Sequence, residues 1–411
     1  MHWWEFHKQV FYMNKETIKN APWLQDASVQ KIFNLLDGEN YRTRAVGGIV
    51  RDSVMGRLGE TNDVDFATEL LPDEVVERAK KAGYKSYPTG IEHGTVTIAI
   101  DKKMFEITSL RQDIKTDGRH AIVQFGTDWL IDAKRRDFTI NALYVGFDGR
   151  LFDPLEQGVN DCQKAHVRFI GKADKRIEED KLRVYRFFRF SASHGKQIFD
   201  ENGLEACKNA ANDLGNISAE RIGVEMMKML ALPKISKTIA ALMTAKIISQ
   251  NSKILEHFNT YENIVKNPNR SERLAILFEQ IKPKELQETW RLSNAQIKIS
   301  QKILNFAKML ANSEIREVAY QLSLEKPSLK NSSINVASAL FNYDKDKTKQ
   351  LQKLLGAIKV PSFPISGKDL LNIGIISGEG MGKTLVELKT QWIKSDFKLS
   401  RKQLLKKVKV K

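Results

Sequence analysis

Cysteine and clustered histidine are scarce in this chain. Among its 411 residues only Cys162 and Cys207 are cysteines, and the seven histidines are scattered. Two cysteines supply neither a disulfide framework nor a cysteine zinc cluster, so nothing favours an oxidising compartment. No HExxH sequence or paired His-Asp cluster occurs, which argues against a zinc protease or a histidine-rich metallohydrolase.

Long apolar runs are missing as well. The stretch Ile239–Ser249 is interrupted by Lys246 and does not reach the length of a membrane span. The N-terminal sequence MHWWEFHKQVFYMNKETIKN has no uninterrupted apolar core and no small-residue cleavage site, so it lacks the features of a secretory signal. We therefore expect a cytoplasmic protein that does not enter a membrane.

Positive charge, by contrast, is abundant. The chain has 66 Lys and Arg against 50 Asp and Glu, a net charge of +16. Residues 351–411 alone hold 13 Lys and Arg against four Asp and Glu. A surface this basic favours a polyanionic partner, either nucleic acid or an anionic membrane face. The length suggests two to four domains, each able to bury its own core.

The pattern of secondary structure changes along the chain. Strand-like segments are concentrated in residues 40–153, namely Tyr41–Val46, Asn62–Ala67, Gly94–Ile100, Met104–Leu110 and Asn141–Phe147. Helices are expected between them at Ile49–Arg57 and Pro72–Ala82, and Asp101-Lys102-Lys103 is expected to be a hairpin turn. From about Lys175 onward the periodicity is helical, including Glu178–His194 and Ala219–Leu232. This predicts a mixed α/β or α+β domain followed by helices.

Two carboxylates and a glycine pair point to phosphate chemistry. Asp63 and Asp65 flank Val64 in a predicted strand, where alternate residues share a face and can form the oxygen-rich site that Mg²⁺ prefers. Gly47-Gly48 lies between a strand and a helix, where backbone N–H groups can approach phosphates, and Arg51 follows in the first turn. Each feature alone has an ordinary explanation: the carboxylates could be a solvated acidic pair, the glycines a tight turn, and the arginine part of a surface ion pair. In this order along the chain, however, they predict a triphosphate cradle beside a metal site.

In this arrangement the chain resembles the nucleotidyltransferase superfamily, and more specifically class II tRNA nucleotidyltransferases and the related bacterial poly(A) polymerases. Further motifs follow in the family's order: a ribose motif, a hinge, a base-selecting motif and a bracing helix, at Arg135–Ala142, 153–161, 179–183 and Ile217–Leu230. The resemblance implies an α+β protein, with a mixed-sheet nucleotidyltransferase head at 13–153. It also implies an all-α neck at 154–240, a helical body at 241–340 and a basic, helical tRNA-binding tail at 341–411.

The resemblance implies two Mg²⁺ ions held by Asp63 and Asp65, which activate an RNA 3′-hydroxyl and hold the leaving pyrophosphate. Glu106 is a candidate for a third carboxylate of this site. It could equally be an acidic residue on an edge strand that faces water. In the ribose motif, Asp137 with Arg136 would bind the 2′-hydroxyl, and the same motif contains Asn141 as a nucleotide-binding candidate.

The base-selecting motif allows a chemical argument. Cytosine and adenine each place an amino donor beside a ring-nitrogen acceptor, whereas uracil and guanine place a carbonyl beside an N–H donor. A fixed carboxylate and guanidinium therefore fit the first pair and mismatch the second. Asp180 and Arg183 lie three residues apart on a predicted helix and would share a face; an exposed salt bridge is the alternative. Glu179 would orient Arg183, and Arg186 could touch phosphate or ribose.

Candidate RNA contacts lie elsewhere. Ser109–Asp132 is expected to be a mobile loop that contains Arg111 and Arg119, and a plain surface loop is the alternative. Lys383 and Arg401 of the basic tail are candidates for binding the RNA backbone. Ser377–Thr384 (SGEGMGKT) resembles a P-loop, but it begins with serine and lies in a helical region, so we interpret it as a helix–glycine–helix connection.

Segments Glu106–Arg111 and Phe363–Ile375 resemble the CCA-adding group of the family. We therefore expect stepwise addition of C, C and A from CTP and ATP to tRNA 3′ ends, without a nucleic-acid template and with no protein partner implied. The alternatives are a poly(A) polymerase, an enzyme that adds only CC or A, and an inactive RNA-binding protein of the same fold. Met13 is a second candidate start, because residues 1–12 lie outside the resemblance.

Overall fold

The computed structural model describes residues 18–57, 59, 63–90, 93–117, 120–215, 217–312 and 314–408, so the candidate start Met13 lies outside the described residues. The chain divides into two compact units, Met1–Glu225 with Ala241–Ser249, and Met226–Ala240 with Gln250–Lys411. All described strands lie in the first unit, and the described elements of the second are helices. The α+β class, a mixed-sheet head followed by helices, is confirmed; the boundaries at 153, 240 and 340 stay a prediction.

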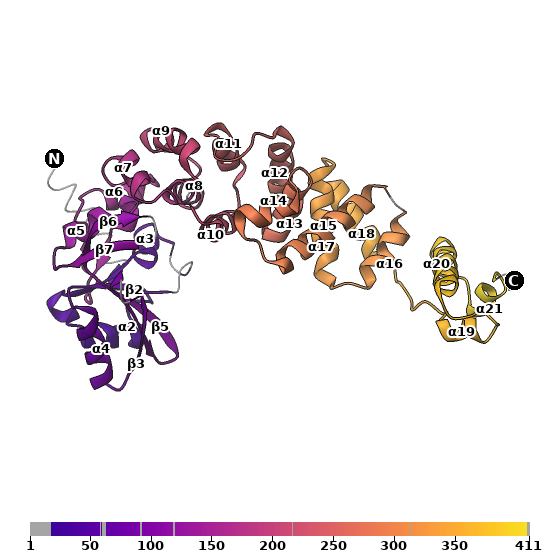
Figure 1. Ribbon diagram of the computed structural model, residues 1–411, viewed down its shortest axis with the longest axis horizontal. Helices are drawn as coiled ribbons and strands as arrows, with labels where there is room; N and C mark the ends of the chain where they lie inside the picture. The colour runs from indigo at the N-terminus through magenta and orange to yellow at the C-terminus, as the bar shows by residue number, and fades with distance from the viewer. Residues whose placement is uncertain are drawn as a thin grey trace. The chain divides into compact units, whose positions relative to one another are not determined.

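A mixed sheet forms the centre of the first unit. Its described strands run in the order β3-β4-β5-β2-β1-β8-β9, and neighbours are antiparallel except β2 and β5, which are parallel. Figure 1 shows several of these strands, in indigo and purple, at the N-terminal end of the chain. Their bounds are β1 (Thr43–Val46), β2 (Asp65–Thr68), β3 (Lys85–Gly90), β4 (Thr95–Ile100), β5 (Lys103–Ser109), β8 (Tyr144–Val145) and β9 (Leu151–Phe152).

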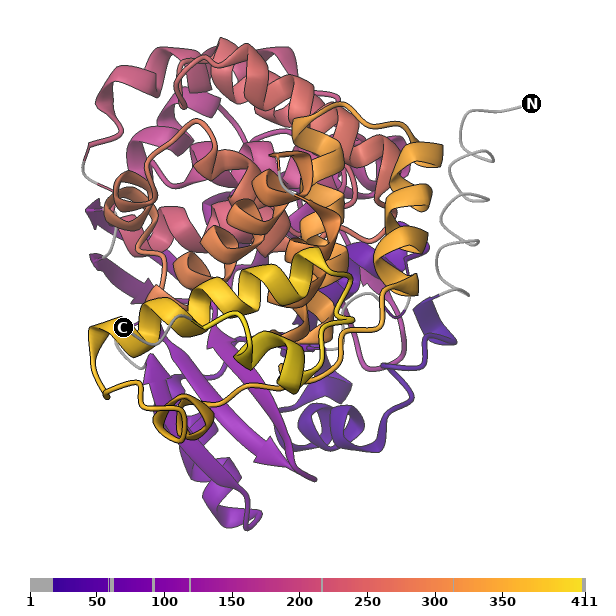
Figure 2. The ribbon, with the colours of Figure 1, turned by 90° about the vertical axis from the view of Figure 1, so that its right-hand side faces the viewer.

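Helices α2 (Ala27–Leu35) and α4 (Pro72–Lys81) lie beside this sheet (Figures 1 and 2). Phe33 of α2 packs edge-on against Phe66 of β2, with ring centroids 5.1 Å apart, and α4 contacts β3 and β4. The remaining described helices of this unit that precede Glu225 are η1 (Gly38–Asn40), α3 (Gly48–Val54), α5 (Trp129–Arg135), η3 (Thr139–Asn141), α6 (Gly158–Lys164), α7 (Ala173–Glu179), α8 (Arg183–Ser193), α9 (Glu201–Ala210), η4 (Ala211–Asp213) and the start of α10 (Ala219–Met229). The α2 and α4 side of the sheet is therefore buried, and at β1, β2 and β8 the opposite side is buried too, where Val46, Ala67 and Tyr144 pack with Leu110 and Ala133.

The predicted hairpin between β4 and β5 is present. Asp101 and Lys102 connect the two strands with φ angles of 50° and 66°. The predicted loop at Ser109–Asp132 is wrong, because β6 (Arg111–Asp117) pairs antiparallel with β7 (His120–Phe125) and α5 follows. Arg119 lies outside the described residues.

Three predicted elements are shorter than expected. The strand expected at Asn62–Ala67 begins only at Asp65, so Asp63 precedes it. The strand expected at Asn141–Phe147 is reduced to β8, because residues 139–141 form the 3₁₀ turn η3. The helix expected at Glu178–His194 is interrupted between α7 and α8, where Asp180 is extended with φ −152° and ψ 102°.

The second unit is a series of helices. They are α12 (Ser252–Ile264), α13 (Arg270–Phe278), α14 (Pro283–Trp290), α15 (Asn294–Asn312), α16 (Ile315–Ser323), α17 (Pro327–Leu340), α18 (Lys345–Ala357), α19 (Gly367–Leu371), α20 (Glu379–Lys394) and α21 (Arg401–Leu405); α11 (Ser236–Thr244) contributes residues to both units. Near the C-terminus Trp392 is buried against Tyr320, Phe363 and Phe397. In the described part of the chain no helix has the length and apolar character needed to cross a membrane.

Candidate active site

One pocket of the first unit collects most of the predicted site residues. It has a volume of about 380 Å³. Its lining residues are Gly47, Gly48, Arg51, Asp65, Arg135, Arg136, Asp137, Asn141, Asp180, Arg183, Arg186 and Phe190. Every predicted nucleotide-binding residue except Glu179 is among them. Asp63 and Glu106, predicted as catalytic, do not line the pocket.

The glycine pair begins one wall. Gly47 has φ 81°, a conformation that side chains disfavour, and a β-carbon added there would lie 3.7 Å from Asp65 Oδ2. Gly48 starts α3, whose first backbone N–H groups have no partner within the helix. A helix start of this kind is suited to phosphate oxygens.

Arg51 is held rigidly at the pocket wall. Its Nε donates to Asp52 Oδ1 at 2.9 Å, and its Nη1 donates to Asn141 Oδ1 at 2.9 Å. Both Arg51 and Asp52 are buried, so the pair is no surface ion pair. Behind it, Asp52 Oδ1 also lies 3.2 Å from His194 Nε2. The cation in the pocket is therefore fixed by contacts from α3, η3 and the end of α8.

The acidic residues lie on neighbouring strands. Phe66 of β2 pairs with Ile107 of β5, so the preceding positions place Asp65 beside Glu106. Partial loss of hydration among the surrounding pocket atoms, together with the negative charges of Glu106 and Asp63, raises the pKa of Asp65 to about 6, although its side chain still reaches solvent. Among the described residues no three His, Cys, Asp or Glu side chains form a group able to hold a metal on their own. A metal here would need further ligands.

Asp137 is the best satisfied carboxylate of the pocket. Its Oδ2 accepts from Arg186 Nη2 at 2.5 Å, and its Oδ1 accepts from Asn141 Nδ2 at 3.0 Å and from the Phe138 amide at 2.8 Å. Burial alone would raise its pKa, but the charge of Arg186 and these hydrogen bonds lower the pKa of Asp137 to about 2. Asp137 is thus a fixed anionic acceptor.

Arg136, expected beside Asp137, has different partners. Its Nη2 lies 3.0 Å from Asp132 Oδ2, and its Nε is 3.2 Å from the Tyr144 hydroxyl. Arg135 also donates to Asp132, at 2.7 Å. Asp132 is buried in α5 and thereby anchors both arginines at the pocket wall.

The base-selecting motif lies at the break between α7 and α8. The argument that Asp180 and Arg183 share one helical face is wrong, because α7 ends at Glu179 and α8 begins at Arg183. Both nevertheless line the pocket. Asp180 Oδ2 accepts from Arg221 Nη2 of α10 at 2.6 Å, and its Oδ1 accepts from the Leu182 amide at 3.1 Å.

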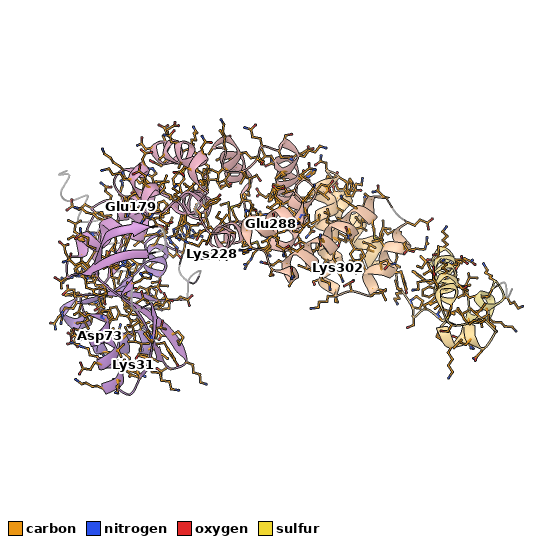
Figure 3. All side chains as sticks on the ribbon, viewed as in Figure 1. Lys31, Asp73, Glu179, Lys228, Glu288 and Lys302 are labelled. Carbon is orange, nitrogen blue, oxygen red and sulfur yellow. The ribbon has the colours of Figure 1, made fainter. Side chains whose placement is uncertain are left out.

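Glu179 binds Arg183 from outside the pocket lining. Its Oε2 accepts from Arg183 Nη1 at 2.7 Å, and Arg183 Nη2 donates to the Arg135 carbonyl at 3.0 Å. Glu179 lies at the end of the first unit opposite Lys31 and Asp73 (Figure 3). Arg186 binds Asp137 and also lies 3.5 Å from Glu225. The guanidinium groups of this wall are thus all held by acids or carbonyls.

Sequence reasoning missed Arg176. This buried residue donates from Nη1 to Glu179 Oε1 at 2.8 Å and from Nη2 to the Arg136 carbonyl at 2.8 Å. It therefore ties the base-selecting motif to the ribose motif. The spacing of three residues between Arg176 and Glu179 on a helix could have predicted their ion pair. The contact with the Arg136 carbonyl could not have been predicted, because it joins segments 40 residues apart.

The predicted RNA contacts lie outside this pocket lining. Arg111 lines a separate hollow of about 200 Å³ at the base of the β6–β7 hairpin. In the second unit, the exposed Lys383 binds Glu379 at 2.8 Å on α20, and Arg401 binds Asp369 at 2.5 Å. The P-loop-like segment joins α19 to α20 through Gly378, and no described strand lies beyond Phe152. The expected connection between helices is confirmed only for Ser377 and Gly378, because Glu379–Thr384 already form the start of α20.

Comparison with known proteins identifies the family. Residues 43–168 match the family described as "Poly A polymerase head domain", and residues 198–256 match "Probable RNA and SrmB- binding site of polymerase A". CCA tRNA nucleotidyltransferase 1, mitochondrial, of Mus musculus is 34% identical, over 93% of this chain and 89% of the relative. The protein of the same name from Homo sapiens is 33% identical, over 98% of this chain and 94% of the relative. The chain belongs to the CCA tRNA nucleotidyltransferase family.

A solved structure agrees with this at the level of the fold. The crystal structure of the Bacillus stearothermophilus CCA-adding enzyme in complex with CTP has a TM-score of 0.73 and 24% identity, covering 90% of this chain and 94% of that one. As a member of the CCA tRNA nucleotidyltransferase family the protein is an enzyme, and the expected family is confirmed. An inactive RNA-binding protein is not favoured.

Proposed function

We propose that this protein adds C, C and A stepwise to the 3′ end of tRNA, using CTP and ATP and releasing pyrophosphate. The observation that carries the proposal is the single pocket in which the glycine pair, Asp65, Asp137 and the Asp180–Arg183 pair meet. Relatives named CCA tRNA nucleotidyltransferases, which this chain matches over 89% and 94% of their length, support this activity over that of a poly(A) polymerase.

Asp63 and Asp65 would hold Mg²⁺. Their hard carboxylate oxygens suit this ion, which commonly takes only one or two protein carboxylates and completes its shell with substrate phosphates and water. This fits a site that has no third ligand group of its own among the described residues. When bound, Mg²⁺ would lower the pKa of the RNA 3′-hydroxyl and stabilise the leaving pyrophosphate. Glu106, beside Asp65, is proposed as a catalytic carboxylate that adds negative charge to the site without being needed as a third metal ligand.

The remaining pocket residues would bind and select the nucleotide. Gly47, Gly48 and Arg51 would bind the triphosphate through backbone N–H groups and a fixed cation. Asp137, already ionised, would accept from the ribose 2′-hydroxyl, with Asn141 and Arg186 holding the carboxylate in place; Arg136 would lend positive charge from its position on Asp132.

Base choice would depend on Asp180 and Arg183. Arg221 fixes Asp180, and Glu179 fixes Arg183, so the acceptor and the donor are immobilised before the base arrives. A carboxylate has about four lone-pair sites, so Asp180 can accept from a base amino group while it is bound to Arg221. Arg183 would donate to the ring nitrogen of C or A.

Arg111, Arg119, Lys383 and Arg401 are the proposed contacts to the tRNA backbone. Arg401, Lys402 and Lys406 line one basic hollow of the second unit, which supports an anionic ligand there. The cytoplasm is our proposed location, although both mammalian relatives are mitochondrial by name. Microscopy of the full-length protein with a C-terminal fluorescent tag tests the location.

Replacement of Arg183 tests the selection of C and A. Arg183→Ala should raise the kcat/KM for UTP and GTP relative to CTP by about tenfold or more, because an unpaired polar group costs about 1–3 kcal/mol. The KM for CTP should change less, since the triphosphate contacts remain. Arg183→Lys is the matched control for charge, because it keeps the cation near Glu179 but loses the planar fork. Equal loss for all four nucleotides would contradict the proposed selection.

A further inference from the structure

The face of β3–β5 that is turned away from α2 and α4 exposes an unusual group of side chains. Tyr87 of β3 is 43% exposed and Met104 of β5 is 55% exposed, although most large apolar side chains of this unit are buried. Lys85 is exposed on the same strand as Tyr87. Val96, Ile98 and Phe105 are buried at the alternate strand positions, which face the opposite side.

Strand register connects this face to the carboxylates. Tyr87 pairs with Thr97, and Thr97, which is itself buried, pairs with Glu106, so these three residues form one row across the sheet. The next strand, β2, carries Asp65 beside Glu106. Lys85, Ala99 and Met104 form the neighbouring row. With strands about 4.8 Å apart, Tyr87 lies roughly 10 Å from Glu106.

The geometry of the reaction indicates which substrate binds the exposed face of β3–β5. In phosphoryl transfer the attacking oxygen and the leaving group lie roughly in line on opposite sides of the phosphorus. The triphosphate cradle lies on the β1 side of Asp65, because Val46 pairs with Asp65 and Gly47 follows it. The attacking 3′-hydroxyl must therefore approach from the other side of Asp65, which is the side of β5, β4 and β3.

We propose that the exposed face of β3–β5, formed by Lys85, Tyr87 and Met104, binds the unpaired 3′-terminal nucleotides of the RNA acceptor. A base stacks on Tyr87 and Met104, and Lys85 lies against the phosphate that follows. This inference rests on the proposed function, since it assigns the second substrate of the same site.

The chemistry of the face favours single-stranded RNA over a protein partner. Single strands bind where exposed aromatic rings lie beside basic side chains, because every base has a face that can stack. A sheet with aromatic side chains on its open face is one of the known ways to bind unpaired bases. A base-paired stem offers no free base face, so the unpaired end is the part of tRNA that fits.

Steady-state kinetics of the full-length protein test the proposal. Tyr87→Ala should raise the KM for a tRNA that lacks CCA by roughly tenfold, the effect expected of one lost stacked base, and should leave the KM for CTP unchanged. Tyr87→Phe, which keeps the ring, should restore most of the loss. Lys85→Gln should lower the slope of log KM against log salt by about 0.7, the contribution of one phosphate contact on a single strand. Lys80→Gln, an exposed lysine on α4, is the matched control and should leave both values unchanged.

A crosslink separates this proposal from the proposed function. A tRNA with 4-thiouridine as its last nucleotide, irradiated with the protein in the absence of nucleoside triphosphates, should crosslink to the peptides of β3 and β5. Crosslinking there without any CCA addition would overturn the function but retain the RNA face. Normal CCA addition with crosslinks only elsewhere, or a Tyr87→Ala variant that changes oligomeric state and not the KM for tRNA, would overturn the RNA face.

Discussion

His194 lies behind the pocket and contributes to the stability of its wall. This buried histidine touches Asp52, the partner of Arg51. Burial lowers the pKa of His194 from its ordinary value of 6.5 to about 4. Between these values the unfolded chain binds a proton that the folded protein does not, so stability should fall as the pH drops from 6.5 towards 4.

This effect can be measured by chemical denaturation at several pH values. The His194 contribution should cost on the order of 3 kcal/mol of unfolding free energy between pH 7 and pH 4, following about 1.4 kcal/mol for each unit of pKa difference. His194→Gln removes the titrating group, so the difference in stability between this variant and the wild type should shrink as the pH falls. A constant difference across the range would contradict the buried neutral histidine.

Arg176 is expected to influence base choice indirectly, through Glu179. It binds Glu179, which in turn binds Arg183, and it also binds the Arg136 carbonyl. Arg176→Lys keeps the charge but not the planar fork, so Arg183 should become less fixed. We expect UTP and GTP incorporation relative to CTP to rise several-fold, but less than in Arg183→Ala. If the variant only lowers overall activity and keeps the wild-type nucleotide preference, Arg176 has no part in base choice.

At the scale of elements, the sequence predicted those helix ends and turns that are determined by residues close together in the chain. Pro72 starts α4 and Gly83 follows its end, and the turn at Asp101-Lys102 joins β4 to β5. The break at Asp180 was missed because the apolar period continues across it. There the Asp180 side chain accepts the Leu182 amide and so competes with the helix for a backbone donor. The β6–β7 hairpin was missed because RQDIKTD lacks the apolar alternation of a half-buried strand.

The close packing of the start of α6 against η3 predicts that Gly158 cannot be replaced by a larger residue without loss of stability. A β-carbon added to Gly158 would lie 2.6 Å from the Thr139 carbonyl oxygen and 2.8 Å from Leu143, so α6 could not lie so close to η3. Gly158→Ala should cost about 1–3 kcal/mol of stability, as overpacking usually does. Thermal unfolding measures this loss, and a reduced kcat/KM for CTP should accompany it because η3 carries Asn141. Gly215→Ala is the matched control, since open space surrounds Gly215; equal effects of both changes would contradict the packing argument.

For the whole molecule, the sequence predicted the α+β class, the family and most of the residues that line the pocket. It could not predict which arginine binds which acid, because contacts such as Arg186–Asp137 and Arg221–Asp180 join segments about 40 residues apart or more. The shared helical face of Asp180 and Arg183 was wrong for a local reason, because the helix breaks at Asp180. Their meeting in one pocket depends on tertiary contacts with α10 and with residues of the ribose motif.

The excess positive charge belongs to this scale too. Residues 351–411 carry 13 Lys and Arg, and Lys402 and Lys406 line an exposed hollow with Arg401. If this region binds the tRNA backbone, changing both lysines to glutamine should lower the salt slope of log KM by about 2, because each phosphate contact contributes roughly 0.9 on a duplex. Lys284→Gln with Lys298→Gln, two exposed lysines of α14 and α15, is the matched control. A slope that falls equally in both variants would mean that general charge, and not this hollow, binds RNA.

The central claim is that one pocket adds C, C and A in order without a nucleic-acid template. The most direct measurement gives the purified protein Mg²⁺ and single nucleotides on three tRNAs, ending before CCA, after the first C and after CC, with Asp65→Asn as the inactive control. We predict incorporation of C on the first two substrates, of A on the third, and then no further addition. Long A tails, addition of only CC or only A, or activity no higher than that of Asp65→Asn would contradict the account.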